Sequence, residues 1–396
     1  MFDDRPPVAV VTFYLYKATK AVEFYRPIMY LYFLSAGLDF TQIALLEAVY
    51  NATTIFGEVP TGYVGDRIGR RNSLLVGTLL IAGTLVGLGL AASFPAFLAL
   101  YACWSLGYTF RSGTEDAWLY ETLEDVLDTD DFTRIRGRAQ AVALGVGVVG
   151  SVVGGYIAGF DLAYPFYVAA VVTALGAVFL LRLDEPTSYE EAESLSVRDA
   201  LGVVREAVTS EGVRAFVLYY FVLFASVSYL VFVYLQPVLE TVLSGLGVTN
   251  VEGALGWYYA AIGVVSAGLS YRTDWVRERV GTRTWFLVVP FGIGGFLAVL
   301  SFAPLLALPA FVFARGITSV TRSLAGQYVN DRIETAGRAT TLSAMSMASA
   351  LAVVPVQVAS GVVADAYSPV VALGAGGVFL VVGSAVVLAL SDAIIA

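Results

Sequence analysis

The stretch Gly62–Arg71 reads GYVGDRIGRR and joins two long apolar runs, at 40–62 and 73–93. A helical run of this length crosses about 30 Å of hydrocarbon, because an α-helix rises about 1.5 Å per residue. The glycines allow a tight turn between two such helices, and Asp66 can pair with the arginines beside it. The stretch therefore predicts a short charged loop between two membrane-spanning helices.

The rest of the chain repeats this alternation of apolar runs and short polar loops. Of its 396 residues, 58% are hydrophobic and only 14% are charged, and the mean hydropathy is +0.76. A soluble protein would carry roughly a quarter charged residues. We therefore predict an all-α membrane protein with twelve transmembrane helices. The expected helices cover 9–35, 40–62, 73–93, 96–121, 138–160, 164–182, 214–238, 252–271, 284–302, 305–330, 338–363 and 370–391.

Short motifs of the first half recur in the second. The run Asp66–Arg71 is echoed by Glu278–Arg283, and Arg111 is echoed by Arg322. A parallel repeat of six spans is typical of transporters whose halves rock about a central cavity. The predicted organisation is a six-helix half at 1–183, a cytoplasmic linker at 184–211 and a pseudo-symmetric six-helix half at 212–396.

The arginines of the loops predict the orientation. They follow the even-numbered helices, whereas the loops after odd-numbered helices hold none. Positively charged loops stay on the cytoplasmic side of a membrane. We therefore expect a multi-pass protein of the cytoplasmic membrane with both termini in the cytoplasm.

The loop that decides the fold also resembles a family signature. Every defined position of Gly62–Arg71 is similar to the helix 2–3 signature of the major facilitator superfamily, glycine-x-x-x-Asp-Arg-x-Gly-basic-basic. The resemblance implies a gating motif in which Asp66 meets the N-terminus of helix 11, where the helix dipole favours an anion. The residues that it assigns to the motif are Gly62, Asp66, Arg67, Gly69, Arg70 and Arg71.

Two further resemblances point to the proton-coupled drug and solute exporters of that superfamily. The run Gly150–Gly155 is similar to a glycine-rich element of the antiporters, with Ser151 in place of its proline. Arg111 stands where drug antiporters carry an arginine thought to assist proton transfer, but Thr114 and Glu115 replace the Gln and Gly of that motif. The match to this branch is partial.

Charged residues inside the expected spans carry the strongest functional information. On a continuous first helix, Lys17, Lys20, Glu23 and Arg26 follow one another in steps of three, so Glu23 can pair with Lys20 or with Arg26. A carboxylate with alternative partners suits a conformational switch. A static ion network would have the same pattern.

The fourth helix adds a second group of charges. Arg111 and Glu115 form an i,i+4 pair, and Asp116 lies about 100° further round the helix, in the direction we expect the first helix to occupy. The chain has no histidine, and arginine stays charged, so proton exchange in the spans falls to carboxylates and two lysines. Asp116 and then Glu23 are the predicted proton carriers, with a fixed interhelical salt bridge as the alternative.

Other polar residues extend the predicted cavity. Glu47 and Asn51 begin a polar stripe on the second helix, Gln236 lies in the seventh, and two arginines share one face of the tenth. Polar groups inside spans face the bundle interior or water. The predicted substrate-cavity residues are Lys20, Arg26, Glu47, Asn51, Arg111, Glu115, Gln236, Arg315 and Arg322.

These patterns predict a secondary active transporter for a small organic solute, with proton-coupled efflux as the leading mode. Uptake or exchange of an organic anion, held by Arg111, Arg315 and Arg322, is the alternative within this class, and a non-transporting membrane sensor is the alternative outside it. No phosphate-binding loop or nucleophile elbow suggests an enzyme. The single cysteine and absent histidine suggest neither cofactor nor metal site, and the acidic balance argues against nucleic acid. We expect a monomer that interacts with protons, solute and lipid.

Overall fold

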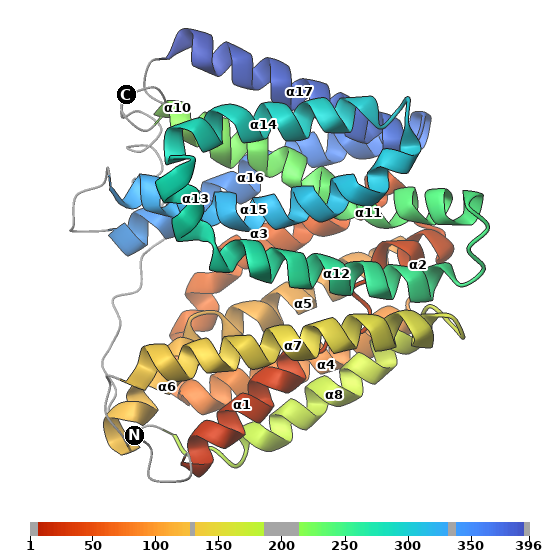
Figure 1. Cartoon of the computed structure of the whole chain (residues 1–396). Coiled ribbons are helices and arrows are strands. Elements are labelled where there is room, and N and C mark those ends of the chain that lie inside the picture. Colours follow the sequence, from red (N-terminus) through yellow and green to blue (C-terminus); the bar gives the residue numbers. More distant parts are fainter. Residues whose placement is uncertain (1–6, 127–130, 186–213, 332–337, 392–396) are drawn as a thin grey trace. The chain divides into compact units, whose positions relative to one another are not determined.

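The described part of the chain is helical, without a strand among those residues (Figure 1). The structure is a computed structural model. Each of the twelve predicted ranges corresponds to one helix or to consecutive helices, which confirms the all-α fold class. Among the described residues, seven helices are long and apolar enough to cross a membrane. The structure describes residues 7–126, 131–185, 214–331 and 338–391.

Contacts between residues divide the chain into two compact units. Unit 1 contains the described residues within Met1–Met29, Val49–Ser194 and Glu252–Ala260, and unit 2 contains those within Tyr30–Ala48, Leu195–Val251 and Ala261–Ala396. The predicted linker falls mostly at 186–213, outside the described residues.

In unit 1, α8 packs against both α4 and α1. α4 also packs against α5, and α1 also packs against α7. Its apolar core includes Phe13, Leu74, Trp118 and Leu180, drawn from four helices and all nearly inaccessible. The helices are α1 (Val8–Ala21), α3 (Phe40–Ile68, from Val49), α4 (Arg70–Leu90), α5 (Phe94–Arg111), α6 (Thr114–Val126), α7 (Phe132–Ala158) and α8 (Tyr164–Leu180).

Unit 2 has α11 at its centre, packed against α15, α16 and α17, while α14 packs along α17. Pro237 lies inside α11 without ending it, so this helix runs beyond its predicted end at 238. The helices are α2 (Met29–Ser35, from Tyr30), the start of α3, α10 (Arg214–Phe216), a π-helix η2 (Val217–Phe224), α11 (Ala225–Gly245), α12 (Val251–Tyr271, except Glu252–Ala260, which belongs to unit 1), α13 (Thr273–Arg279), α14 (Thr282–Val299), η3 (Pro304–Leu306), α15 (Ala307–Asn330), α16 (Arg338–Ala366) and α17 (Pro369–Leu390).

The first predicted span is not continuous. α1 ends at Ala21 and α2 begins at Met29, so the chain leaves the α-helix over 22–28. Pro27 explains the break, because its nitrogen cannot donate to the Glu23 carbonyl and its ring disfavours a helical conformation at Arg26. The prediction of one helix over 9–35 is therefore wrong at this point.

The fourth predicted span is also interrupted, the second is longer than expected, and the third begins and ends three residues earlier than expected. α5 ends at Arg111 and α6 starts at Thr114, with Gly113 between them at φ +73°. By contrast, α3 and α4 are separated by Gly69 alone, at φ +93°, a conformation that glycine adopts without strain. The predicted loop at 63–72 is thus helical except at Gly69.

Candidate substrate and coupling site

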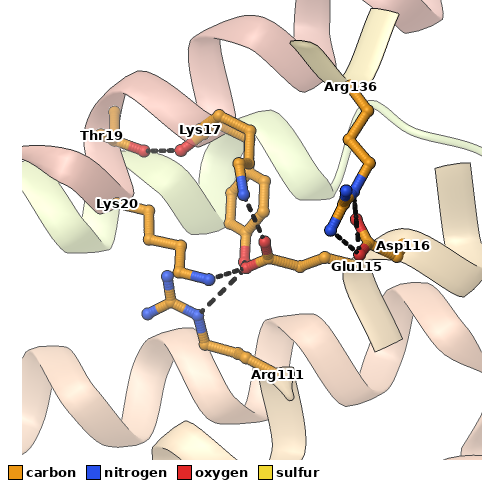
Figure 2. Close-up of polar contacts among 8 residues, drawn as sticks. Lys17, Thr19, Lys20, Arg111, Glu115, Asp116 and Arg136 are labelled. Carbon is orange, nitrogen blue, oxygen red and sulfur yellow. Dashed lines mark hydrogen bonds and ion pairs between the residues drawn. The ribbon is translucent and has the colours of Figure 1, made fainter. Parts of the chain in front are cut away.

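Glu115 is the centre of a buried ion cluster in unit 1 (Figure 2). Its Oε2 lies 2.8 Å from Lys17 Nζ, and its Oε1 contacts Lys20 Nζ. The Tyr16 hydroxyl donates to Oε1 at 3.1 Å, and Arg111 Nε lies 3.8 Å from the same oxygen. The side chains of Glu115 and Arg111 are only 8% and 5% exposed, so these ion pairs are poorly screened by solvent.

Three helix ends bring the cluster together. On α1, Lys20 lies four residues after Tyr16 and three after Lys17, so its side chain is next to both. The bend at Gly113 separates Arg111, the last residue of α5, from Glu115 in the first turn of α6. A carboxylate in a first turn interacts favourably with the helix dipole. The cluster therefore joins α1, α5 and α6, where the sequence predicted only a first and a fourth helix.

The charges of the cluster do not balance. Three cationic side chains, Lys17, Lys20 and Arg111, surround the single carboxylate of Glu115. Among the described residues, Arg111 Nε and Nη2 are buried and have no hydrogen-bond partner. The Arg111 guanidinium lies 5.8 Å from the Tyr16 ring centroid, which gives part of its charge an aromatic partner.

Asp116 points away from this cluster. Its carboxylate binds Arg136 of α7, with Oδ2 2.9 Å from Nη2 and Oδ1 accepting from Nε at 3.0 Å (Figure 2). The prediction that Asp116 would face the first helix is wrong, because the bend at Gly113 turns Glu115 to that side instead. The Asp116 side chain is also 48% exposed, in contrast to Glu115.

Glu23 lies in the non-helical segment of the first span. Its Oε2 accepts from Arg26 Nε at 2.7 Å, while Lys20 binds Glu115. Glu23 therefore pairs with Arg26 and not with Lys20. The helix that would place Glu23 beside Lys20 ends at Ala21.

The glycines of α7 allow the non-helical segment 22–28 to pack against this helix. A Cβ at Gly154 would collide with the Phe24 carbonyl, and one at Gly150 would approach Val22 to 3.3 Å. Both glycines are buried. The glycine-rich run of α7 therefore lets the non-helical backbone of the first span pack closely against this helix.

Three of the other predicted cavity residues come together in unit 2. Gln236 Oε1 accepts from the Tyr30 backbone N–H at 2.8 Å, and the Tyr30 hydroxyl donates to Glu47 at 2.9 Å. The Tyr30 ring packs edge-on against Phe232, and the Arg315 guanidinium lies 5.0 Å from the Phe232 ring centroid. Asn51 of α3 is half-buried, and Arg322 of α15 is exposed.

The loop after α3 forms a small charge network. Arg70 Nη1 lies 2.9 Å from Asp66, and Arg70 Nε lies 3.2 Å from Glu121 of α6. The Arg67 guanidinium lies 4.3 Å from the Tyr63 ring centroid. Gly69 provides the turn, whereas a Cβ at Gly62 would meet open space. The expected meeting of Asp66, in unit 1, with the start of helix 11 at residue 338, in unit 2, stays a prediction.

Comparison with known proteins decides the family. The profile of the Major Facilitator Superfamily matches residues 21–356, most of the chain. The chain belongs to this superfamily. It is therefore a multi-pass membrane protein of a transporter family, as the signature, the composition and the helical fold predict.

Two relatives within the superfamily illustrate its range. The transporter YxaM of Bacillus subtilis (strain 168), described as an MFS-type transporter, is 23% identical over 93% of this chain and 91% of its own length. The gentisate transporter of Corynebacterium glutamicum is 30% identical over 39% of this chain and 35% of its own length.

Solved structures of other transporters share the fold. The nucleoside transporter NupG superposes with a TM-score of 0.80 at 14% identity, over 96% of this chain and 97% of that one. A bacterial homologue of the human lysosomal transporter Spinster superposes with a TM-score of 0.74 at 15% identity, over 98% and 97%. Identities this low show the fold alone.

Sequence reasoning missed two features of this superfamily member. Tyr16 belongs to the ion cluster, and its position one turn before Lys20 was the available signal. Glu185, which lies just after the sixth span, accepts from the Arg71 backbone N–H at 3.1 Å in the first turn of α4. A carboxylate at a helix N-terminus is stabilised by the helix dipole, but nothing in the sequence paired Glu185 with that helix.

Proposed function

We propose that this protein is a secondary active transporter that moves a small organic solute by alternating access and couples that movement to protons. The observation that carries the proposal is the ion cluster around Glu115, buried among helices of a membrane protein. An ionised side chain inside a span costs roughly 3 kcal/mol unless it is paired or meets water or solute. Such a cluster has partners that a transport cycle can exchange.

The proton carrier in this proposal is a carboxylate whose cationic partners lie on another helix, because such a pair can separate when helices move. Glu115 meets this condition through Lys17 and Lys20 of α1, and Asp116 meets it through Arg136 of α7. Glu23 binds Arg26 of its own segment. We therefore propose Glu115 and Asp116 as carriers and retain Glu23 as the third.

The membrane and the direction of transport are also parts of the proposal. The arginines after even-numbered spans favour the cytoplasmic membrane with both termini in the cytoplasm. The proposed direction, efflux, rests on the partial resemblance of α7 to the antiporters. The close packing at Gly150 and Gly154 is a second explanation for the presence of those glycines. Gentisate is a suitable first solute, because one relative is named for its transport.

The test is proton flux in liposomes that contain the purified protein and a pH-sensitive dye. A panel of organic acids and cations, beginning with gentisate, is applied inside or outside the vesicles. We expect one solute class to drive proton movement in the wild type. Glu115→Gln or Asp116→Asn should uncouple protons from solute, whereas Asp274→Asn, which removes an exposed carboxylate of α13, should not. Solute movement without protons in the wild type would contradict the coupling.

A further inference from the structure

The carboxylate of Glu115 fills a place that would otherwise suit a ligand. Its Oε2 binds Lys17, while its Oε1 binds Lys20 and Tyr16. These donors lie on α1, and the carboxylate reaches them from α6. Ammonium and hydroxyl donors that converge on both oxygens of one carboxylate form a receptor for that group.

Arg111 adds donors that Glu115 does not satisfy. The guanidinium is 5% exposed and approaches the carboxylate only to 3.8 Å at Nε. Its Nε and Nη2 have no hydrogen-bond partner among the described residues. A guanidinium presents its N–H groups as a planar fork that matches a carboxylate in two parallel hydrogen bonds. Buried donors of this kind are costly when unpaired, so they indicate a missing anionic group.

The charge count points the same way. Lys17, Lys20 and Arg111 face one carboxylate, so a second anionic group would bring the cluster nearer to neutrality. Access is on the lysine side, because the Lys20 side chain is 31% exposed. An incoming anion would therefore meet Lys20 before it reaches Arg111.

We propose that this cluster binds the carboxylate of a small organic acid, and that Glu115 is a built-in counter-ion which the ligand carboxylate displaces from the lysines. The inference rests on the proposed function for its role in transport, and it names the solute class of that site. In the empty state Glu115 neutralises part of the lysine charge. In the loaded state the ligand binds Lys17, Lys20 and Arg111, and Glu115 is released from them.

The chain offers a direct reporter, because Lys17 and Lys20 are its only lysines. Reductive ¹³C-methylation of the whole purified protein keeps the positive charge and labels both amines of the cluster. Their NMR signals can be assigned with Lys17→Arg and Lys20→Arg. Benzoate is the probe, its neutral analogue benzamide is the matched control, and inorganic phosphate tests the alternative anion class.

We expect benzoate to shift both lysine signals saturably, and benzamide to leave them unchanged at the same concentration. Arg111→Gln should weaken benzoate binding at least tenfold. Glu115→Gln should strengthen it, because the competing carboxylate is gone while the side chain keeps a similar shape. Asp274→Asn should leave the affinity unchanged.

Equal shifts with benzoate and benzamide, or none with either, would overturn the proposal. Shifts with phosphate alone would overturn the carboxylate class. Weaker benzoate binding in Glu115→Gln would overturn the counter-ion role. If that variant does not yield folded protein, Lys20→Gln, with Lys17 as reporter, must lose affinity for benzoate.

The assay measures binding without transport. Saturable binding together with proton-independent transport would contradict only the proposed coupling, and coupled transport of a cation without benzoate binding would contradict only this inference.

Discussion

Arg111 determines much of the chemistry of unit 1, because it is the most deeply buried cation of the ion cluster. Its guanidinium lies 5.8 Å from the Tyr16 ring centroid and 3.8 Å from the Glu115 carboxylate, and its Nε and Nη2 have no hydrogen-bond partner within the described part of the chain. A lysine at this position would keep the charge and lose the planar fork and most of the stacking on Tyr16. Charge and geometry can therefore be separated at this residue.

We predict that Arg111→Lys preserves folding and insertion but impairs transport. The variant keeps a cation near Glu115, so its unfolding temperature should stay within a few degrees of the wild type, as expected for a change below about 1 kcal/mol. The rate of solute uptake or release should fall at least tenfold, because the bidentate contact is lost. Transport at the wild-type rate would show that only the charge of Arg111 matters.

The break in the first span is the element that most affects the arrangement of the site. It ends the helical register after Lys20, so Lys17 and Lys20 bind Glu115 while Glu23 binds Arg26. The non-helical backbone packs on the glycine face of α7. Irregular backbone inside a span persists only where protein or a water-filled cavity surrounds it.

Two glycines of α7 allow this packing to be tested. Gly154→Ala should destabilise the protein by about 1–3 kcal/mol, because the added methyl overpacks the contact with the Phe24 carbonyl. Gly145→Ala is the matched control, since a Cβ there meets nothing within 4 Å and alanine favours the helix. Thermal unfolding in detergent, followed by tryptophan fluorescence, compares the two. Equal unfolding temperatures would contradict the close packing of Phe24 on α7.

The sequence predicted the helices well and the contacts of the charges less well. Apolar runs of span length indicate helices directly, so all twelve ranges were found. Hydropathy does not detect a break whose residues remain largely apolar, and Pro27 was the only local signal for 22–28. The bend at Gly113 decided whether Glu115 or Asp116 faces α1, and only a structure could supply that rotation. The roles of these residues in proton coupling stay predictions.

For the whole molecule, the proposed alternating access would require helical bodies to move against one another. The network of Asp66, Arg70 and Glu121 connects the α3–α4 turn to α6. Because Arg70 contacts two carboxylates, the loss of one contact leaves the other in place. Neutralising Asp66 should therefore change the conformational equilibrium without unfolding unit 1.

We predict that Asp66→Asn inserts and folds normally but turns over more slowly than the wild type. Its inward–outward balance can be measured by the accessibility of introduced cysteines in a Cys103→Ser background. Asp274→Asn, which removes an exposed carboxylate of α13, is the control for the loss of one carboxylate. A wild-type rate in Asp66→Asn would remove the gating role of this residue.

The contact of Glu185 with the first turn of α4 has a practical consequence for dividing this transporter into two separately expressed polypeptides. The first half was predicted to end at residue 183, but Trp118 Nε1 donates to the Asp184 carbonyl at 3.2 Å and Glu185 accepts from Arg71. A cut after residue 183 would deprive α4 of an anionic partner at its start and would leave the buried Trp118 indole without its acceptor. The first polypeptide should therefore retain both acidic residues, and the cut belongs after Glu185.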